Sequence, residues 1–178
     1  MRKALYFLGI LNDSDIDWLI AAGSRREITA GTRLIEEGRQ IDSVFLVIDG
    51  VFSVHIAALG TREVARLMSG EVMGEMSFVD QAPPSATVQA KEPSFVLDIP
   101  RRRLNAKLAE DAGFASRFYR ALSMFLAARL RSTNNALAGR SSGDTEDEMD
   151  FDALDNVSMA GARFDWVQKR LRSAKGNA

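Results

Sequence analysis

An α+β fold, in which a small antiparallel β-roll is flanked by helices, is predicted by three features of the sequence. Short apolar runs of strand type recur between residues 26 and 99 and are separated by turn residues. Asp49-Gly50 lies between two of these runs and is a strong hairpin signal. From Pro100 onward, apolar residues repeat at three- and four-residue spacing, which is the period of a helix. Regularly spaced short strands with glycine and proline between them are typical of a small barrel or jelly roll.

The first expected element is a helix that ends near Ala22. Asn12 or Ser14 can cap its N-terminus, and Gly23 ends it. Seven strands are then expected, at 26–29, 33–36, 43–48, 51–56, 63–67, 85–91 and 94–99. The hairpin signal predicts that the 51–56 strand returns alongside the 43–48 strand. His55 lies in the 51–56 strand, where we expect a hydrogen-bonded or exposed ring rather than a functional one.

Two helices are expected after the last strand. Pro100 suits a first helical position, so residues 101–108 are predicted to form a short helix. A longer helix runs from about Phe114 to Leu137 and has an apolar stripe that includes Phe118, Leu122 and Phe125. Its opposite face carries Arg117, Arg120, Arg129 and Arg131, which we expect to be solvated. A stripe of this kind is part of the core about as often as it is a subunit seam.

The composition divides the chain into three segments. Residues 1–138 form the folded domain with its long helix, 139–150 an acidic linker, and 151–172 a short helical segment. The last segment contains too many large apolar residues, among them Phe164 and Trp166, for a disordered tail. A turn or cap is expected at 156–161, followed by an amphipathic helix. That helix must bury its apolar side against the β-roll, a partner protomer or another protein.

Composition also excludes several classes of function. The net charge of −1 argues against general nucleic-acid binding, which needs a basic excess. The absence of cysteine excludes disulfides, cysteine-ligated zinc and iron–sulfur clusters, and the single histidine argues against a histidine metal site. No apolar run reaches the roughly 20 residues of a membrane span. The short apolar N-terminus lacks a cleavage-like site, so we expect a cytoplasmic protein without membrane association.

The stretch from Gly70 to Val88 carries the candidate ligand site. Gly74 can supply a positive φ or a close backbone approach. The amides of Met76, Ser77 and Phe78 would then lie unpaired at a helix N-terminus, which attracts anions. Glu75 is an acceptor for sugar hydroxyls. These features indicate a pocket for a phosphorylated sugar, whereas a glycine turn before a one-turn helix is more often only a turn.

The order of residues in this stretch resembles a known motif. Gly74-Glu75-Met76-Ser77-Phe78, followed after a gap by Pro83-Pro84-Ser85-Ala86-Thr87-Val88, resembles the phosphate-binding cassette of cyclic nucleotide-binding domains. These domains are the sensors of the catabolite activator protein family, of cyclic-nucleotide-dependent kinases and of gated channels. The family pattern is Gly-Glu, two small or apolar residues and, after a fixed gap, Pro-Arg-Ala-Ala-Thr-Val. The resemblance covers roughly residues 10 to 135 and implies a β-roll flanked by helices. It implies ligand contacts for Gly74, Glu75, Met76, Ser77, Pro84, Ser85, Ala86 and Thr87.

Pro84 stands where the family has its phosphate-clamping arginine. A guanidinium fork on a phosphate is a charge-assisted, bidentate contact. Its loss lowers affinity about tenfold to several-hundredfold. The cyclic nucleotide is therefore predicted to bind weakly or not at all, unless Arg33, Arg39 or Arg66 replaces the missing arginine.

Two classes of function remain open. The first is a regulatory protein that carries a sensor domain and signals to an unknown protein partner. The second is a dimeric interaction scaffold with a vestigial pocket, or a truncated relative of a transcription regulator. In the resembled family the long helix commonly pairs two protomers, which implies a homodimer through Phe118, Leu122 and Phe125.

Catalysis and DNA binding are not expected. The sequence has neither a histidine paired with a nucleophile nor a Walker-type Gly-Lys-Ser/Thr loop, so we predict no enzyme activity and no cofactor. The stretch after Leu137 begins acidic and is short for a winged helix-turn-helix. Its small basic end, Lys169, Arg170, Arg172 and Lys175, is too little for reading a groove.

Overall fold

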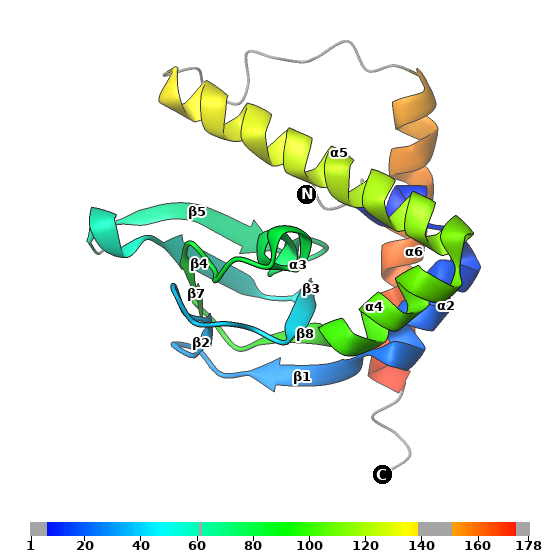
Figure 1. Ribbon diagram of the computed structural model, residues 1–178, viewed down its shortest axis with the longest axis horizontal. Helices are drawn as coiled ribbons and strands as arrows, with labels where there is room; N and C mark the ends of the chain where they lie inside the picture. The colour runs from blue at the N-terminus through cyan, green and yellow to red at the C-terminus, as the bar shows by residue number, and fades with distance from the viewer. Residues whose placement is uncertain (1–6, 61, 139–150, 174–178) are drawn as a thin grey trace.

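Two four-stranded antiparallel sheets form the centre of the computed structural model, which describes residues 7–60, 62–138 and 151–173. One sheet has the order β1-β8-β3-β6 and the other the order β2-β7-β4-β5. In Figure 1, helices α2, α4 and α6 lie at one end of this β-roll, and α5 extends from that end across the view above α3 and β5. The strands are β1 (Ser24–Ile28), β2 (Arg33–Ile35), β3 (Ser43–Asp49), β4 (Val51–His55), β5 (Glu63–Met68), β6 (Val72–Met73), β7 (Thr87–Ala90) and β8 (Ser94–Pro100). The predicted fold class is confirmed.

Strand β3 is buried on both faces, which explains its continuous apolar sequence. Phe45 and Val47 belong to the core between the two sheets. Val44, Leu46 and Ile48 belong to a second core cluster, which includes side chains of the helices. Because side chains alternate between the two faces of a strand, one strand contributes to both cores. The sheet therefore joins the ligand-cassette side of the molecule to its helical side.

The predicted hairpin at Asp49-Gly50 is wrong. Strand β3 pairs with β8 and β6, whereas β4 pairs with β5 and β7, so the chain changes sheet at Gly50. Gly50 has a φ of 103°, and a Cβ at this position would lie 2.0 Å from the Ser94 Oγ. The glycine is needed where the chain passes from one sheet to the other. The Asp-Gly pair looks the same in the sequence whether the chain makes this corner or a tight hairpin turn.

The helices are α2 (Asp13–Ala22), α3 (Glu75–Asp80), α4 (Arg101–Glu110), α5 (Ala112–Leu137) and α6 (Phe151–Ser173), with a 3₁₀ turn η1 (Ala57–Leu59). Asn12 caps α2, and a reciprocal capping box joins it to Asp15. Gly23 follows the last turn of α2, as predicted. Pro100 is the N-cap of α4 rather than its first residue. Residues 7–10 are also helical, and Phe7 and Leu8 of the N-terminal apolar run lie in the core.

The apolar stripe of α5 packs inside its own chain. Phe118 and Leu122 are each 2% exposed and Phe125 is fully buried. The Phe118 ring makes edge contacts with Phe7 at 5.5 Å and with Phe78 at 5.9 Å. Assigning Phe118, Leu122 and Phe125 to a subunit seam was therefore wrong, because their surfaces are covered by the same protomer. Dimerisation by another face stays a prediction.

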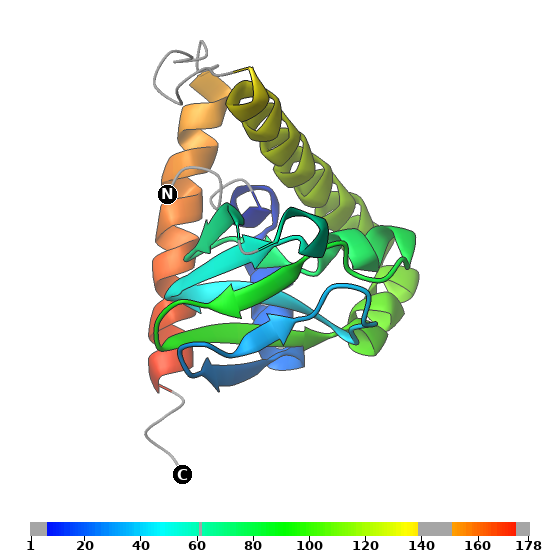
Figure 2. The ribbon, with the colours of Figure 1, turned by 90° about the vertical axis from the view of Figure 1, so that its left-hand side faces the viewer.

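Helix α6 is one continuous helix of 23 residues, so the predicted turn at 156–161 is wrong. Gly161 lies within it, and space is open where its side chain would be. Val167 and Leu171 bury α6 in the helical core, and the Gln168 amide Nε2 donates to the Ile48 carbonyl at 2.8 Å. In Figure 2, α6 runs down the left of the β-roll while α5 slants away from it. The predicted linker at 139–150 lies outside the described residues.

Arg163 joins α6 to the start of the domain. It donates from Nη1 to the Leu8 and Gly9 carbonyls at 3.2 and 3.1 Å, and from Nε to Asp13 at 2.9 Å. Helix α6 is thus attached to α2 and the N-terminal residues. Over the described ranges, no helix has both the length and the hydrophobicity of a membrane span. Within the same ranges, no group of three or more candidate metal ligands comes together.

Candidate ligand-binding cassette

Helix α3 begins at a position that only glycine accommodates. Gly74 is its N-cap, in the left-handed conformation with φ 80°. A Cβ at this position would lie 2.7 Å from the Ile41 Cδ1 atom and 3.1 Å from the Ser43 carbonyl oxygen. Both reasons proposed for Gly74, positive φ and close backbone approach, are therefore confirmed.

The first turn of α3 differs in one respect from the prediction. The amide of Phe78 donates to the Gly74 carbonyl at 3.1 Å, so it belongs to the helix and is not a free donor. The amides of Met76 and Ser77 precede the first intrahelical bond. Ser77 is 3% exposed, whereas the Met76 side chain is 52% exposed and points away from the core. The prediction of an unpaired amide at Phe78 is therefore wrong, because the intrahelical hydrogen bonds of α3 begin at this residue.

Glu75 forms an ion pair with Arg129 of α5. Its side chain is only 3% exposed, and burial raises the pKa of this carboxyl while Arg129 opposes that rise. Arg129 also lies over the Phe125 ring, with the guanidinium carbon 5.2 Å from the ring centroid. The group predicted to accept sugar hydroxyls is thus occupied by a cation from the same chain.

The contact of Arg129 was missed by the sequence analysis, which assigned this residue to a solvated face. Arg129 follows the buried Phe125 by four residues, and such a spacing places two side chains on the same helix face. That spacing was the available signal. Arg117 was missed in the same way, and it pairs with the buried Asp15.

A second arginine holds the backbone of the cassette. Arg101, the first residue of α4, donates from Nη2 to the Ser77 carbonyl at 2.7 Å and from Nη1 to the Ile41 carbonyl at 2.9 Å. Its guanidinium carbon lies 5.8 Å from the centroid of the Phe78 ring. Arg101 therefore ties α3 to the helices that follow the β-roll. Its position after a proline gave no indication of this role.

The second half of the cassette is held by a turn between β2 and β3. Pro84 is buried, and its carbonyl accepts the Gly38 N–H at 2.8 Å. The Thr87 hydroxyl accepts the Glu37 N–H at 3.1 Å. Ser85 is exposed and Ala86 is half-buried. The structure thus brings both halves of the predicted cassette into defined positions, with a buried proline ring where the family pattern has a cation.

The arginines considered as replacements have other surroundings. Arg39 pairs with Glu36 at 2.9 Å, and Arg66 pairs with Glu63. Arg33 lies on β2 opposite Gln89 of β7. Arg129 contacts the cassette through the side chain of Glu75, and Arg101 contacts it through the backbone.

Comparison with known proteins agrees with this geometry. Residues 25–111 match the sequence model of the cyclic nucleotide-binding domain, over just under half of the chain. Over these residues the chain is similar to that domain. The matched range contains both halves of the cassette and ends where α5 begins, so α5 and α6 follow the matched region. No curated protein sequence matches the chain significantly.

Solved cyclic nucleotide-binding domains share the fold. One from Methylobacillus flagellatus superposes with a TM-score of 0.70 and 21% identity, over 80% of this chain and 84% of its own. The catabolite activator protein of Thermus thermophilus has a TM-score of 0.61 and 27% identity, over 72% of this chain and 59% of its own. The N-terminal domain of a Streptomyces coelicolor transcriptional regulator has a TM-score of 0.56 and 28% identity, over 76% and 90%. This chain thus spans less than two thirds of the Thermus protein.

Proposed function

We propose that this is a regulatory protein whose cyclic nucleotide-binding domain has a degenerate phosphate site and acts through contacts with other proteins. The observation that carries the proposal is Pro84, a buried ring at the position of the phosphate-clamping arginine. A proline side chain has neither charge nor hydrogen-bond donors to hold a cyclic phosphate. The proposal includes a cytoplasmic location and excludes catalysis and direct DNA binding by this chain.

The Glu75–Arg129 pair supports the same reading of the site. A nucleotide sugar that donated hydroxyls to Glu75 would compete with a charge-assisted contact already made inside the protein. Binding would therefore carry two penalties, one at the phosphate and one at the sugar. We expect cyclic AMP and cyclic GMP to bind weakly or not at all.

Calorimetry of the protein against cyclic AMP and cyclic GMP tests the proposal, with Pro84→Arg as the restoring variant. We expect Pro84→Arg to strengthen binding about tenfold or more, because a guanidinium then reaches the phosphate position. Pro83→Arg is the matched control, since it adds the same charge one residue away at an exposed position. Micromolar binding by the unmodified protein, or an equal gain from Pro83→Arg, would contradict the proposal.

A dimeric scaffold is the second candidate, and one observation favours it. The large apolar side chains that are most exposed among the described residues lie on α3, α5 and the region of β5. They are Leu59, Val64, Met68, Met76, Val79, Tyr119, Met124 and Leu130. Exposed apolar side chains that gather into one patch often mark a protein–protein interface. A second copy of the chain would then use Tyr119, Met124 and Leu130 of α5 in place of the buried stripe.

Sedimentation tests the scaffold. We expect a dimer that Met124→Glu with Leu130→Glu converts to monomer, since a charge inside a desolvated seam is unfavourable. Ser123→Glu with Asn134→Glu adds the same two negative charges at exposed positions of the same helix and serves as the control. A monomeric starting protein would rule out this second candidate and leave the first intact.

A further inference from the structure

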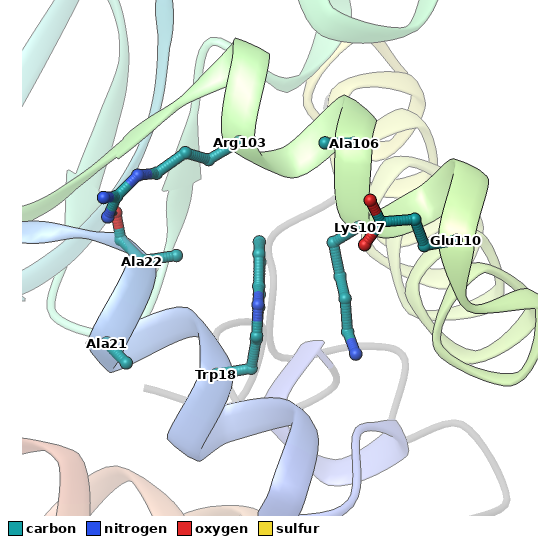
Figure 3. A pocket seen from close by; sticks show the side chains of 7 residues that line it. All are labelled: Trp18, Ala21, Ala22, Arg103, Ala106, Lys107 and Glu110. Carbon is teal, nitrogen blue, oxygen red and sulfur yellow. The ribbon is translucent and has the colours of Figure 1, made fainter.

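A hollow between α2 and α4 lies apart from the cassette and is lined by an indole ring, alanines and charged side chains. Its volume is about 280 Å³, and its walls come from two helices (Figure 3). The lining residues are Trp18, Ala21, Ala22, Arg103, Ala106, Lys107 and Glu110. Three of these residues are alanines, whose methyl groups leave the space between the helices unfilled. The volume is just below the roughly 300–1,000 Å³ of ordinary ligand sites, so it suits a molecule with one ring.

The indole of Trp18 forms a fixed wall of this hollow. Its ring meets Phe114 edge-on, with centroids 5.3 Å apart, so its orientation is set by the core. The Lys107 ammonium lies 5.9 Å from the indole centroid, and Figure 3 shows the ring standing between Lys107 and Arg103. Lys107 therefore faces one side of the indole, and the other side is turned to the Arg103 side of the hollow. A flat ring can stack on that side.

Arg103 supplies the polar contact beside the free face of Trp18. Its Nη1 donates to the Ala22 carbonyl at 3.0 Å, at the C-terminal end of α2, which has no basic residue in its own last turn. This bond holds the guanidinium in place and uses one of its five N–H donors. The remaining donors suit a carboxylate, which matches the guanidinium fork.

The other charged residues of the hollow limit the charge that a ligand can carry. The Lys107 ammonium is paired with Asp111 at 2.9 Å, so much of its charge is already compensated. Glu110 adds a negative charge to the lining. A dianion such as a phosphate monoester would be repelled more strongly by Glu110 than a monoanion. The lining thus favours a single carboxylate attached to an apolar ring.

We propose that the hollow between α2 and α4 is a second binding site, for a small aromatic carboxylate whose ring stacks on Trp18 and whose carboxylate binds Arg103. The site lies on α4, the element whose first residue, Arg101, holds the cassette backbone. It is independent of the state of Pro84 and of any cyclic nucleotide.

Titrating the full chain with sodium benzoate tests the site, with benzyl alcohol as an uncharged ligand of similar shape. The indole N–H resonance of Trp18 is the readout, distinguished from Trp166 by a Trp166→Phe variant. We expect a saturable shift with a millimolar Kd for benzoate and about tenfold weaker binding for benzyl alcohol. The absence of a saturable shift at Trp18, or one at Trp166 alone, would overturn the proposal.

Two variants with matched controls separate the ring contact from the charge contact. Ala106→Leu fills the hollow and is expected to weaken benzoate binding at least tenfold, whereas Ala109→Leu, exposed on the same helix, leaves it unchanged. Arg103→Met is expected to remove the preference for benzoate over benzyl alcohol, and Arg102→Met to keep it. Unchanged binding in Ala106→Leu would contradict the site even if Arg103→Met fails to fold. Equal losses in a variant and its control would also contradict it.

Discussion

Helix α5 makes two ion pairs with buried carboxylates, and the two pairs have different surroundings. Near its start Arg117 pairs with Asp15 of α2, and nearer its end Arg129 pairs with Glu75 of the cassette. Both carboxylates are 3% exposed. One pair joins two helices of the core, whereas the other joins a helix to the candidate ligand site.

The number of donors distinguishes the two pairs. Asp15 accepts Arg117 Nε at 2.6 Å, Arg117 Nη2 at 2.8 Å and the Asn12 N–H at 3.0 Å. The hydrogen bonds with Asp15, and then its charge, raise the pKa of the Arg117 guanidinium. Glu75 contacts one nitrogen of Arg129, and burial raises its pKa. A buried carboxylate held by three donors from two other residues is a structural element, whereas one whose only side-chain partner among the described residues is a single arginine nitrogen can exchange that partner for a ligand.

The largest effect is expected from Arg117→Met. This change leaves the Asp15 carboxylate buried without its bidentate partner, at a cost of about 3–5 kcal/mol of unfolding free energy. Urea denaturation gives the value. Arg120→Met removes an exposed arginine of the same helix and is expected to change stability by less than about 0.5 kcal/mol. Similar losses in the two variants would show that Asp15 is not specially dependent on Arg117.

A smaller effect is expected from replacing the carboxylates themselves. Asp15→Asn weakens three hydrogen bonds, including the capping contact with Asn12, and should cost about 2–3 kcal/mol. Glu75→Gln weakens one contact and relieves the desolvation of a charge, so it should cost about 1 kcal/mol. Thermal denaturation of the two variants side by side compares the pairs directly. A greater loss of stability in Glu75→Gln than in Asp15→Asn would contradict the assignment of the Asp15 pair as structural and the Glu75 pair as exchangeable.

The next smaller effect is expected from Arg129→Met, which should lower the free energy of unfolding by about 1 kcal/mol near neutral pH. The loss is small because Glu75 can bind a proton when its partner is gone. A carboxyl with a raised folded pKa contributes stability below its unfolded value of 4.5, and this contribution is lost as pH rises through the folded pKa. Removing Arg129 raises that pKa further. The variant should therefore be closest to the parent at pH 5 and less stable at pH 8. A difference that is constant between these pH values would mean that Glu75 does not titrate.

The smallest effect is expected at an exposed pair, which serves as a reference for the buried ones. Hydrogen bonds from Lys91 and then from Arg66 lower the pKa of Glu63 from 4.5 to about 2. Its contribution to stability is present above 4.5 and lost as pH falls towards 2. We expect Lys91→Met to return the pKa of Glu63 towards 4.5, measured by NMR titration, with little change in melting temperature. A large loss of stability would show that exposure does not separate this pair from the others.

Local sequence patterns were enough to predict most of the helices and strands. They failed where the structure of a segment depends on the strand with which it pairs. The strands around Phe45 and Phe52 and the cap at Asn12 have signals contained in a few neighbouring residues. Strand β6 has two residues, too few for any periodicity, and exists because β3 pairs with it. The turn at Gly50 has the same signal in a hairpin and in a change of sheet. Only the pairing of β4 with β5 and β7 distinguishes these two outcomes.

The candidate site shows the same division. Gly74 was identified from sequence because its requirement is a property of its own backbone. Phe118 and Phe125 were correctly placed on an apolar helix face, but a periodic face does not state which surface covers it. The covering surface is the core of the same protomer.

By itself, the sequence determined the β-roll, its helices and the substitution of Pro84 in the cassette, because these depend on residue type and spacing along the chain. The tertiary structure alone decided that Arg129 reaches Glu75 and that Arg101 holds the backbone at Ser77. It also decided that α6 covers the far side of β3. An arginine on a helix has the same local signal whether it meets water or a carboxylate. Its role therefore depends on how the helix is docked, and docking is fixed by the packing of side chains from distant parts of the chain.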